Sequence, residues 1–127
     1  METIHCKLVN LQATDYQNVR ELYTNEEVRK YLGGPIVDEQ EFRAKFFNML
    51  ESSAPDFYYW VIRANINNDF IGLISLSKHH DGSDTEVSYQ LLPNWWGNGY
   101  GTEVVERVLL FAFNELDLAK VIAETQI

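Results

Sequence analysis

The sequence has little of several residue types, and each scarcity excludes a class of protein. Its 127 residues include one cysteine, Cys6, so an intrachain disulfide and a cysteine metal cluster are excluded. A lone thiol suits a reducing compartment, and we expect the chain in the cytoplasm. No apolar run approaches the roughly 18–20 residues that span a bilayer. The polar start Met1-Glu2-Thr3 lacks signal-peptide architecture, so no membrane partner is expected.

Basic residues are also scarce. Lys and Arg number 10 against 19 Asp and Glu, which gives a formal net charge of −9. A protein that binds nucleic acid through charge needs a basic face that displaces counterions, so no nucleic acid partner is expected. The excess of carboxylates favours a basic or amine partner instead.

Repeats, low-complexity segments and linkers are absent, so we interpret residues 1–127 as a single continuous domain. A chain of this length buries roughly two-thirds of its unfolded surface and needs no metal or disulfide to fold. His79 and His80 are adjacent in a polar stretch without a nearby cysteine or spaced acidic cluster. We interpret them as solvated turn residues, and no metal site is expected.

The periodicity of the sequence predicts strands and helices in a mixed order. Alternating or continuous apolar runs predict five strands, at residues 4–11, 57–64, 70–77, 85–92 and 120–127. The second and third are expected to form a hairpin, because the asparagine-rich segment 65–69 between them tolerates the positive φ of a tight turn.

Three short helices are expected between the first and second strands. Thr14 and Gln17 have the spacing of a capping box, and Asp38 and Glu41 repeat it. Asn25 is a candidate cap for a helical turn between these two. With a long helix before the last strand, the order predicts a mixed α/β (α+β) domain.

The long helix is predicted from a broad apolar face that runs from Val104 to Leu116. Glu103 and Arg107 are four residues apart on its outer side, where an ion pair adds a few tenths of a kcal/mol.

A glycine-rich segment precedes this helix: Trp95-Trp96-Gly97-Asn98-Gly99-Tyr100-Gly101-Thr102-Glu103. Glycines at alternate positions allow backbone N–H groups to turn inward at a helix N-terminus, which is a site for phosphate or pyrophosphate. A Walker loop is excluded because the segment has no lysine, and a dinucleotide fingerprint is excluded because position 102 is threonine. The alternative is a turn that only joins strand to helix.

The stretch Glu86-Val87-Ser88-Tyr89-Gln90-Leu91-Leu92-Pro93-Asn94-Trp95-Trp96-Gly97-Asn98-Gly99-Tyr100-Gly101-Thr102-Glu103 resembles the acetyl-CoA signature of the GNAT-superfamily N-acetyltransferases. It is most similar to the subgroup of the ribosomal-protein N-terminal acetyltransferases RimJ and RimL. Similar residues recur at Tyr31-Leu32-Gly33-Gly34-Pro35, Trp60-Val61-Ile62 and Ile71-Gly72-Leu73-Ile74, so the resemblance covers essentially the whole chain.

The resemblance implies a GNAT-like fold, with a mixed, mainly antiparallel central sheet flanked by helices, and acetyl-CoA as cosubstrate. It implies that the backbone amides of the loop hold the pyrophosphate: Gly97, Asn98, Gly99, Tyr100, Gly101 and Thr102. It also implies that Gln90, Leu91 and Leu92 pair with the pantetheine arm like an added strand. Trp96 stands where the superfamily usually has Gln or Arg, so binding is expected to rest on backbone donors and the helix dipole.

The resemblance also suggests residues for the reaction. Glu86 matches a position where related enzymes place an acid that binds or deprotonates the amine, and Ser88 is a candidate for orienting the substrate. Glu26, Glu27 and Tyr31 fall where the family forms the acceptor wall. From the residues alone, Glu86 is equally well a solvated acid, and the alternative for Glu26 and Glu27 is a charged helix start.

Members of the family continue past the last predicted strand with a further helix and two strands, so the resemblance implies a C-terminally incomplete domain. An exposed strand at 120–127 predicts pairing with a second copy of the chain. The leading hypothesis is transfer of an acetyl group from acetyl-CoA to a primary amine, of a protein N-terminus or a small molecule, by direct attack. The alternatives are a catalytically impaired acyl-CoA-binding or regulatory module and, less favoured, a structural domain.

Overall fold

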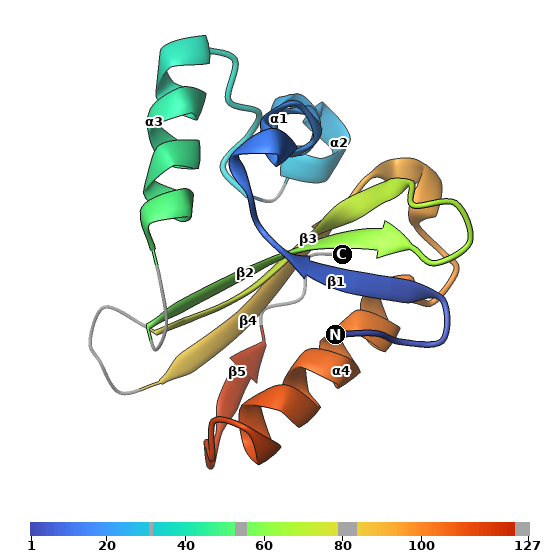
Figure 1. Cartoon of the computed structure of the whole chain (residues 1–127). Coiled ribbons are helices and arrows are strands. Elements are labelled where there is room, and N and C mark those ends of the chain that lie inside the picture. The colour runs from blue at the N-terminus through green and yellow to red at the C-terminus, as the bar shows by residue number, and fades with distance from the viewer. Residues whose placement is uncertain (31, 53–55, 79–83, 124–127) are drawn as a thin grey trace.

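The computed structural model describes residues 1–30, 32–52, 56–78 and 84–123. Helices cover both faces of one five-stranded sheet (Figure 1). The elements are β1 (Cys6–Asn10), α1 (Tyr16–Thr24), α2 (Glu26–Arg29), α3 (Glu39–Glu51), β2 (Phe57–Ala64), β3 (Phe70–Lys78), β4 (Thr85–Leu91), α4 (Tyr100–Asn114) and β5 (Val121–Ala123). Short 3-10 turns at Ala13–Asp15 and Pro93–Trp95 precede α1 and α4. The predicted order of strands and helices is confirmed.

The sheet has the strand order β1-β2-β3-β4-β5. The first three pairings are antiparallel, and β4 pairs with β5 in parallel. This confirms the expected mixed, mainly antiparallel sheet. The central strand β3 is buried along residues 70–76, which explains why this segment is nearly continuously apolar.

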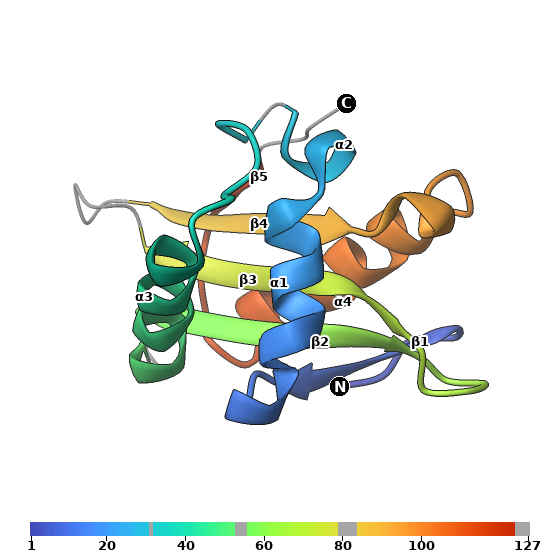
Figure 2. The same cartoon turned by 90° about the horizontal axis from the view of Figure 1, so that it is seen from above.

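Helix α4 lies on one face of the sheet and α1 and α3 lie on the other (Figure 2). Each face has its own hydrophobic core. The α4 side contains buried side chains of β2, β3 and β4 packed against one stripe of the helix: Val104, Val108 and Ala112. The other side contains strand residues packed against α1, α2 and α3, with Phe42 and Phe46 at its centre. Because side chains alternate along a strand, neighbouring residues of β4 point to opposite faces of the sheet.

Two of the predicted caps are confirmed, and one is wrong. The side chain of Asn25 accepts a bond from the Val28 N–H at 3.0 Å, and the Asp38 carboxylate accepts one from the Gln40 N–H at 2.8 Å. The box expected at Thr14 is replaced by a turn that begins two residues earlier, in which the Asp15 carboxylate accepts from the Gln12 N–H at 2.8 Å. The Asp15 carboxylate also accepts from the Arg63 guanidinium of β2 at 3.2 Å, so a partner far along the chain fixes this turn.

The last predicted strand is described only in part. Val121–Ala123 form β5 beside the start of β4. Residues 124–127 lie outside the described residues, so the pairing of two chains through segment 120–127 stays a prediction.

Candidate active site

The glycine-rich segment joins β4 to α4 through two residues in the left-handed region. Gly97 has φ +80° and Gly99, the N-cap of α4, has φ +78°. Such a conformation turns successive backbone N–H groups toward one side and favours glycine. No side chain caps the helix at Gly99, so the N–H groups of its first turn point to where an anion can bind.

The third glycine has a different purpose. A Cβ atom on Gly101 would lie 2.9 Å from Cε2 of Tyr89, so the missing side chain allows the tyrosine ring to pack against the first turn of α4. The ring of Tyr100 lies 5.7 Å from the rings of both Trp95 and His5. The loop is therefore held between aromatic side chains of several elements.

A cavity of about 520 Å³ opens between this loop, the end of β4 and the α2 segment, and we call it the loop cavity. Its volume falls in the range of roughly 300–1,000 Å³ that is typical of small-molecule sites. The lining residues are Glu27, Val28, Lys30, Leu32, Tyr89, Gln90, Leu91, Trp95, Trp96, Gly97, Gly99, Tyr100, Gly101 and Thr102.

The end of β4 presents backbone groups toward its β5 side. The Leu92 N–H donates to the Ile71 carbonyl of β3 at 2.9 Å, so by alternation the amide of Leu91 faces the other edge. The Leu91 carbonyl accepts from Nε1 of Trp96 at 2.9 Å, which ties the loop to the strand. Within the described residues, β5 pairs only with Thr85 to Val87, so it leaves the edge at Leu91 uncovered.

Gln90 contributes an acceptor without a partner. Its Oε1 atom is buried and has no hydrogen bond among the described residues, and Gln90 is one of the residues that line the loop cavity. Burial raises the pKa of the neighbouring Tyr23 hydroxyl, while a hydrogen bond with Gln90 and the charge of Arg29 oppose that rise. A ligand that donates a hydrogen bond here would remove the cost of the buried, unsatisfied oxygen.

The structure places most of the predicted cofactor residues around the loop cavity. Two do not line it, Leu92 and Asn98. Leu92 is buried in the core against α1–α3, and the Asn98 side chain donates to the Trp96 carbonyl at 3.3 Å. The others all line it: Gln90, Leu91, Trp96, Gly97, Gly99, Tyr100, Gly101 and Thr102.

The predicted catalytic residues lie further along β4 and do not line the loop cavity. Glu86 is half-buried and Ser88 is exposed, with its Oγ 3.2 Å from Oγ of Ser75. Both lie on the same face as Gln90, opposite the α4 core. The expected sharing of one strand face is therefore confirmed.

Of the predicted acceptor residues, Glu27 lines the loop cavity and Glu26 is exposed outside its lining. Tyr31 lies outside the described residues, as do His79 and His80. Within the described ranges, no group of three His, Cys, Asp or Glu side chains is placed to hold a metal ion. The same ranges contain no helix with the length and apolarity that crossing a membrane requires.

Five lining residues were not predicted from the sequence: Val28, Lys30, Leu32, Tyr89 and Trp95. Tyr89 lies on the same strand face as Leu91, so the alternation of side chains along the strand could have predicted its place beside the loop. The residues of the α2 segment carry no such signal, because only the folded sheet brings them to a loop more than sixty positions away.

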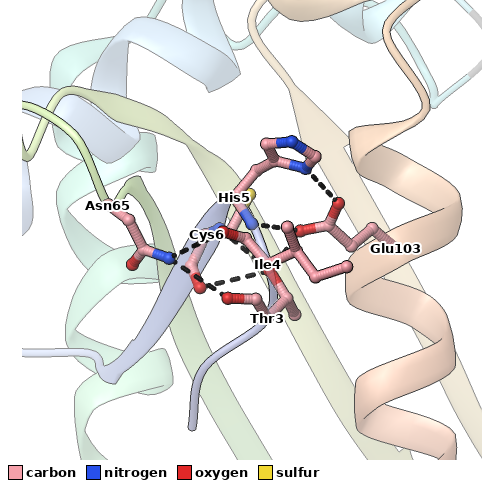
Figure 3. A network of polar contacts seen from close by, with 6 residues as sticks. All are labelled: Thr3, Ile4, His5, Cys6, Asn65 and Glu103. Atoms are coloured by element: carbon pink, nitrogen blue, oxygen red, sulfur yellow. Dashed lines mark hydrogen bonds and ion pairs between the residues drawn. The ribbon is translucent and has the colours of Figure 1, made fainter.

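The first turn of α4 also carries the best-connected carboxylate of this region, Glu103 (Figure 3). It accepts hydrogen bonds from the Thr3 hydroxyl, from the His5 N–H at 2.9 Å and from Nδ1 of His5 at 2.8 Å. The expected ion pair with Arg107 is wrong, because the chain ahead of β1 supplies these three donors. Burial acts to raise the pKa of Glu103, but the bonds from His5 and Thr3 outweigh it and lower the pKa.

A family model described as an acetyltransferase (GNAT) domain matches residues 6–127. The chain belongs to this family. Among curated proteins it is similar to an uncharacterized N-acetyltransferase, YoaA, of Bacillus subtilis, with 24% identity over 95% of the chain. It is also similar to the FsC-acetyl coenzyme A-N(2)-transacetylase of Aspergillus fumigatus, with 29% identity over 98% of the chain. The chain spans 70% and 57% of the lengths of these two relatives.

Solved structures confirm the GNAT fold. A GNAT-family acetyltransferase from Bacillus anthracis superimposes with a TM-score of 0.83 at 20% identity, covering 99% of this chain and 73% of the other. A spermidine N-acetyltransferase from Vibrio cholerae in complex with CoA and spermine gives a TM-score of 0.77 at 19% identity, covering 93% and 69%. GNAT enzymes use acetyl-CoA, and family membership supports an acetyl-CoA-dependent acetyltransferase.

Proposed function

We propose that residues 1–127 form an acetyl-CoA-binding N-acetyltransferase domain of the RimJ/RimL type, which acetylates a primary amine of a protein N-terminus or a small molecule. The observation that carries the proposal is the loop cavity. It places two left-handed glycines and an uncapped helix N-terminus next to a strand edge that β5 leaves uncovered. An anion site beside an open strand edge fits a ligand with a diphosphate and an amide-containing arm, as CoA has.

In this proposal the diphosphate binds the N–H groups of the loop between Gly97 and Thr102. The loop contains no Lys or Arg, so the helix dipole and backbone donors provide the attraction. The pantetheine arm lies along the edge of β4 at Leu91 and pairs with the strand through main-chain bonds. The unpartnered Oε1 of Gln90 is available to a donor on the arm or on the substrate.

The reaction is a direct attack of a neutral amine on the thioester carbonyl. A nitrogen–carbon bond forms, the carbon–sulfur bond breaks, and the departing thiolate takes a proton from solvent water. Glu86 accepts the proton of the amine, directly or through a water molecule. A backbone N–H near Leu91 stabilises the oxyanion, and Glu27 attracts a cationic acceptor to the cavity wall.

A second candidate function is a CoA-binding or regulatory module without catalysis. It is favoured by one observation, that Glu86 and Ser88 do not line the loop cavity. The two candidates share the cofactor site and differ only in turnover.

Two measurements separate these functions. Acetyl-CoA at 100 times its dissociation constant should stabilise the protein by about 2.7 kcal/mol in thermal unfolding. No stabilisation by millimolar acetyl-CoA or CoA would refute both. Thiol release with a panel of amines and N-terminal peptides then decides between an enzyme and a binding module.

Glu86→Gln tests the assigned base. We expect kcat to fall by about 10²–10⁴-fold with nearly unchanged CoA affinity. Glu21→Gln, which removes an exposed carboxylate of α1, is the matched control and should leave kcat unchanged. Equal kcat in both variants would show that Glu86 is only a surface acid.

A further inference from the structure

Glu103 places a negative charge close to the proposed anion site. It is the fourth residue after the N-cap Gly99, and its N–H donates to the Gly99 carbonyl at 3.0 Å. Side chains on a helix tilt toward its N-terminus, so an unrestrained carboxylate at this position reaches back toward the first turn. A diphosphate bound there would be repelled by it.

In the structure this carboxylate is held away from the loop cavity. Tyr100, Gly101 and Thr102 line the loop cavity, but Glu103 does not. Its oxygens instead accept from the Thr3 hydroxyl and from the backbone and ring of His5 (Figure 3). We call Thr3, His5 and Glu103 the N-terminal clamp.

The clamp has support from a second element. Nδ2 of Asn65, in the β2–β3 turn, donates to the carbonyls of Thr3 at 3.1 Å and Ile4 at 3.3 Å, and its N–H donates to the His5 carbonyl at 2.9 Å. Two further titratable groups face the clamp. The Cys6 thiol has a pKa raised by burial and then by the charge of Glu103, and the ring of Tyr100 lies against His5.

We propose that Thr3 and His5 are positioning residues for the cofactor site, which hold the Glu103 carboxylate away from the diphosphate so that CoA affinity depends on this clamp. Thr3 and His5 touch no reacting atom in this proposal. It rests on the proposed function for one point, that a diphosphate binds at the N-terminus of α4.

A double-mutant cycle on the full chain tests the proposal by calorimetric titration with CoA near neutral pH. His5→Ala should weaken CoA binding by about two- to fivefold, the range of a single charge at a helix end. Glu103→Gln should tighten it by a similar factor, and His5→Ala should then have no effect in the Glu103→Gln background. Glu106→Gln, an exposed carboxylate one turn further along α4, is the matched control and should change affinity by less than the clamp variants.

Every outcome of this cycle either supports the proposal or overturns it. An equal loss from His5→Ala in both backgrounds would mean that His5 only braces Tyr100, and the proposal is overturned. Unchanged affinity in all clamp variants overturns it as well. If the wild-type chain does not bind CoA, the proposed function itself fails, which separates the two failures.

Discussion

Replacement of Gly99 by alanine separates backbone strain from ligand binding at the proposed anion site. Gly99 has φ +78°, and a Cβ atom at this position would meet no other atom within 4 Å. The folding cost therefore comes from the left-handed conformation alone, about 1 kcal/mol after the loss of glycine entropy in the unfolded chain. For a chain of this length that cost corresponds to a fall of about 4 °C in the melting temperature.

Gly34 offers a matched control for this change. It has φ +84°, a Cβ atom there would also meet nothing within 4 Å, and it does not line the loop cavity. Both alanine variants should lose the same stability in urea unfolding, with unchanged m-values. Only Gly99→Ala should weaken CoA binding, by about tenfold, or 1.4 kcal/mol, because the methyl group stands where the diphosphate approaches the helix. Equal CoA affinity in the two variants would refute the placement of the diphosphate at Gly99.

Three further changes test the fold around the site. Gly72→Ala should lower the free energy of unfolding in urea by about 3 kcal/mol, because its Cβ would lie 2.0 Å from the backbone oxygen of Gln90. A smaller loss of stability than in Gly34→Ala would contradict this close approach. Lowering the pH from 5 toward 3 should destabilise the wild type more than Glu103→Gln, because the folded-state pKa of Glu103 is below its usual 4.5 and its stabilisation is lost as pH falls through that lowered value. Parallel urea midpoints for the two proteins across that range would show that the carboxylate adds nothing. Asn25→Ala should cost about 0.5–2 kcal/mol by removing the acceptor for the Val28 N–H, and circular dichroism with urea unfolding measures it.

The sequence predicts the order of elements well because its signals are local. Apolar alternation marks the strands, and the oxygen acceptors at Asn25 and Asp38 mark two helix starts. The failure at Thr14 has a tertiary cause: the Asp15 carboxylate lies 3.2 Å from the Arg63 guanidinium of β2, a partner 48 residues away that a local capping rule does not include.

The predictions for the site succeed and fail for the same reason: local signals are found and long-range contacts are not. The glycine loop is predicted because the residues that determine its backbone conformation are consecutive in the sequence. Of the opposite wall only Glu27 is predicted, because Val28 and Leu32 reach the loop cavity only after α2 docks on the sheet. The partners of Glu103 were not predicted for the same reason. Thr3 and His5 come from the other end of the chain, and they bind Glu103 in place of Arg107, which is four residues away from it.

The strand pairings have a consequence for the order in which the elements of the protein fold and unfold. β2, β3 and β4 pair with their sequence neighbours, but β4 meets β5 only across α4, and β1 meets β2 only across three helices. Loop-closure entropy makes the central three strands the first to assemble and the outer strands the last. The one-turn helix α2, a wall of the loop cavity, is expected to exchange its amide protons fastest and β3 slowest. CoA that bridges this wall and α4 should slow exchange most at α2, so the segment that is least stable alone gains the most protection from the ligand.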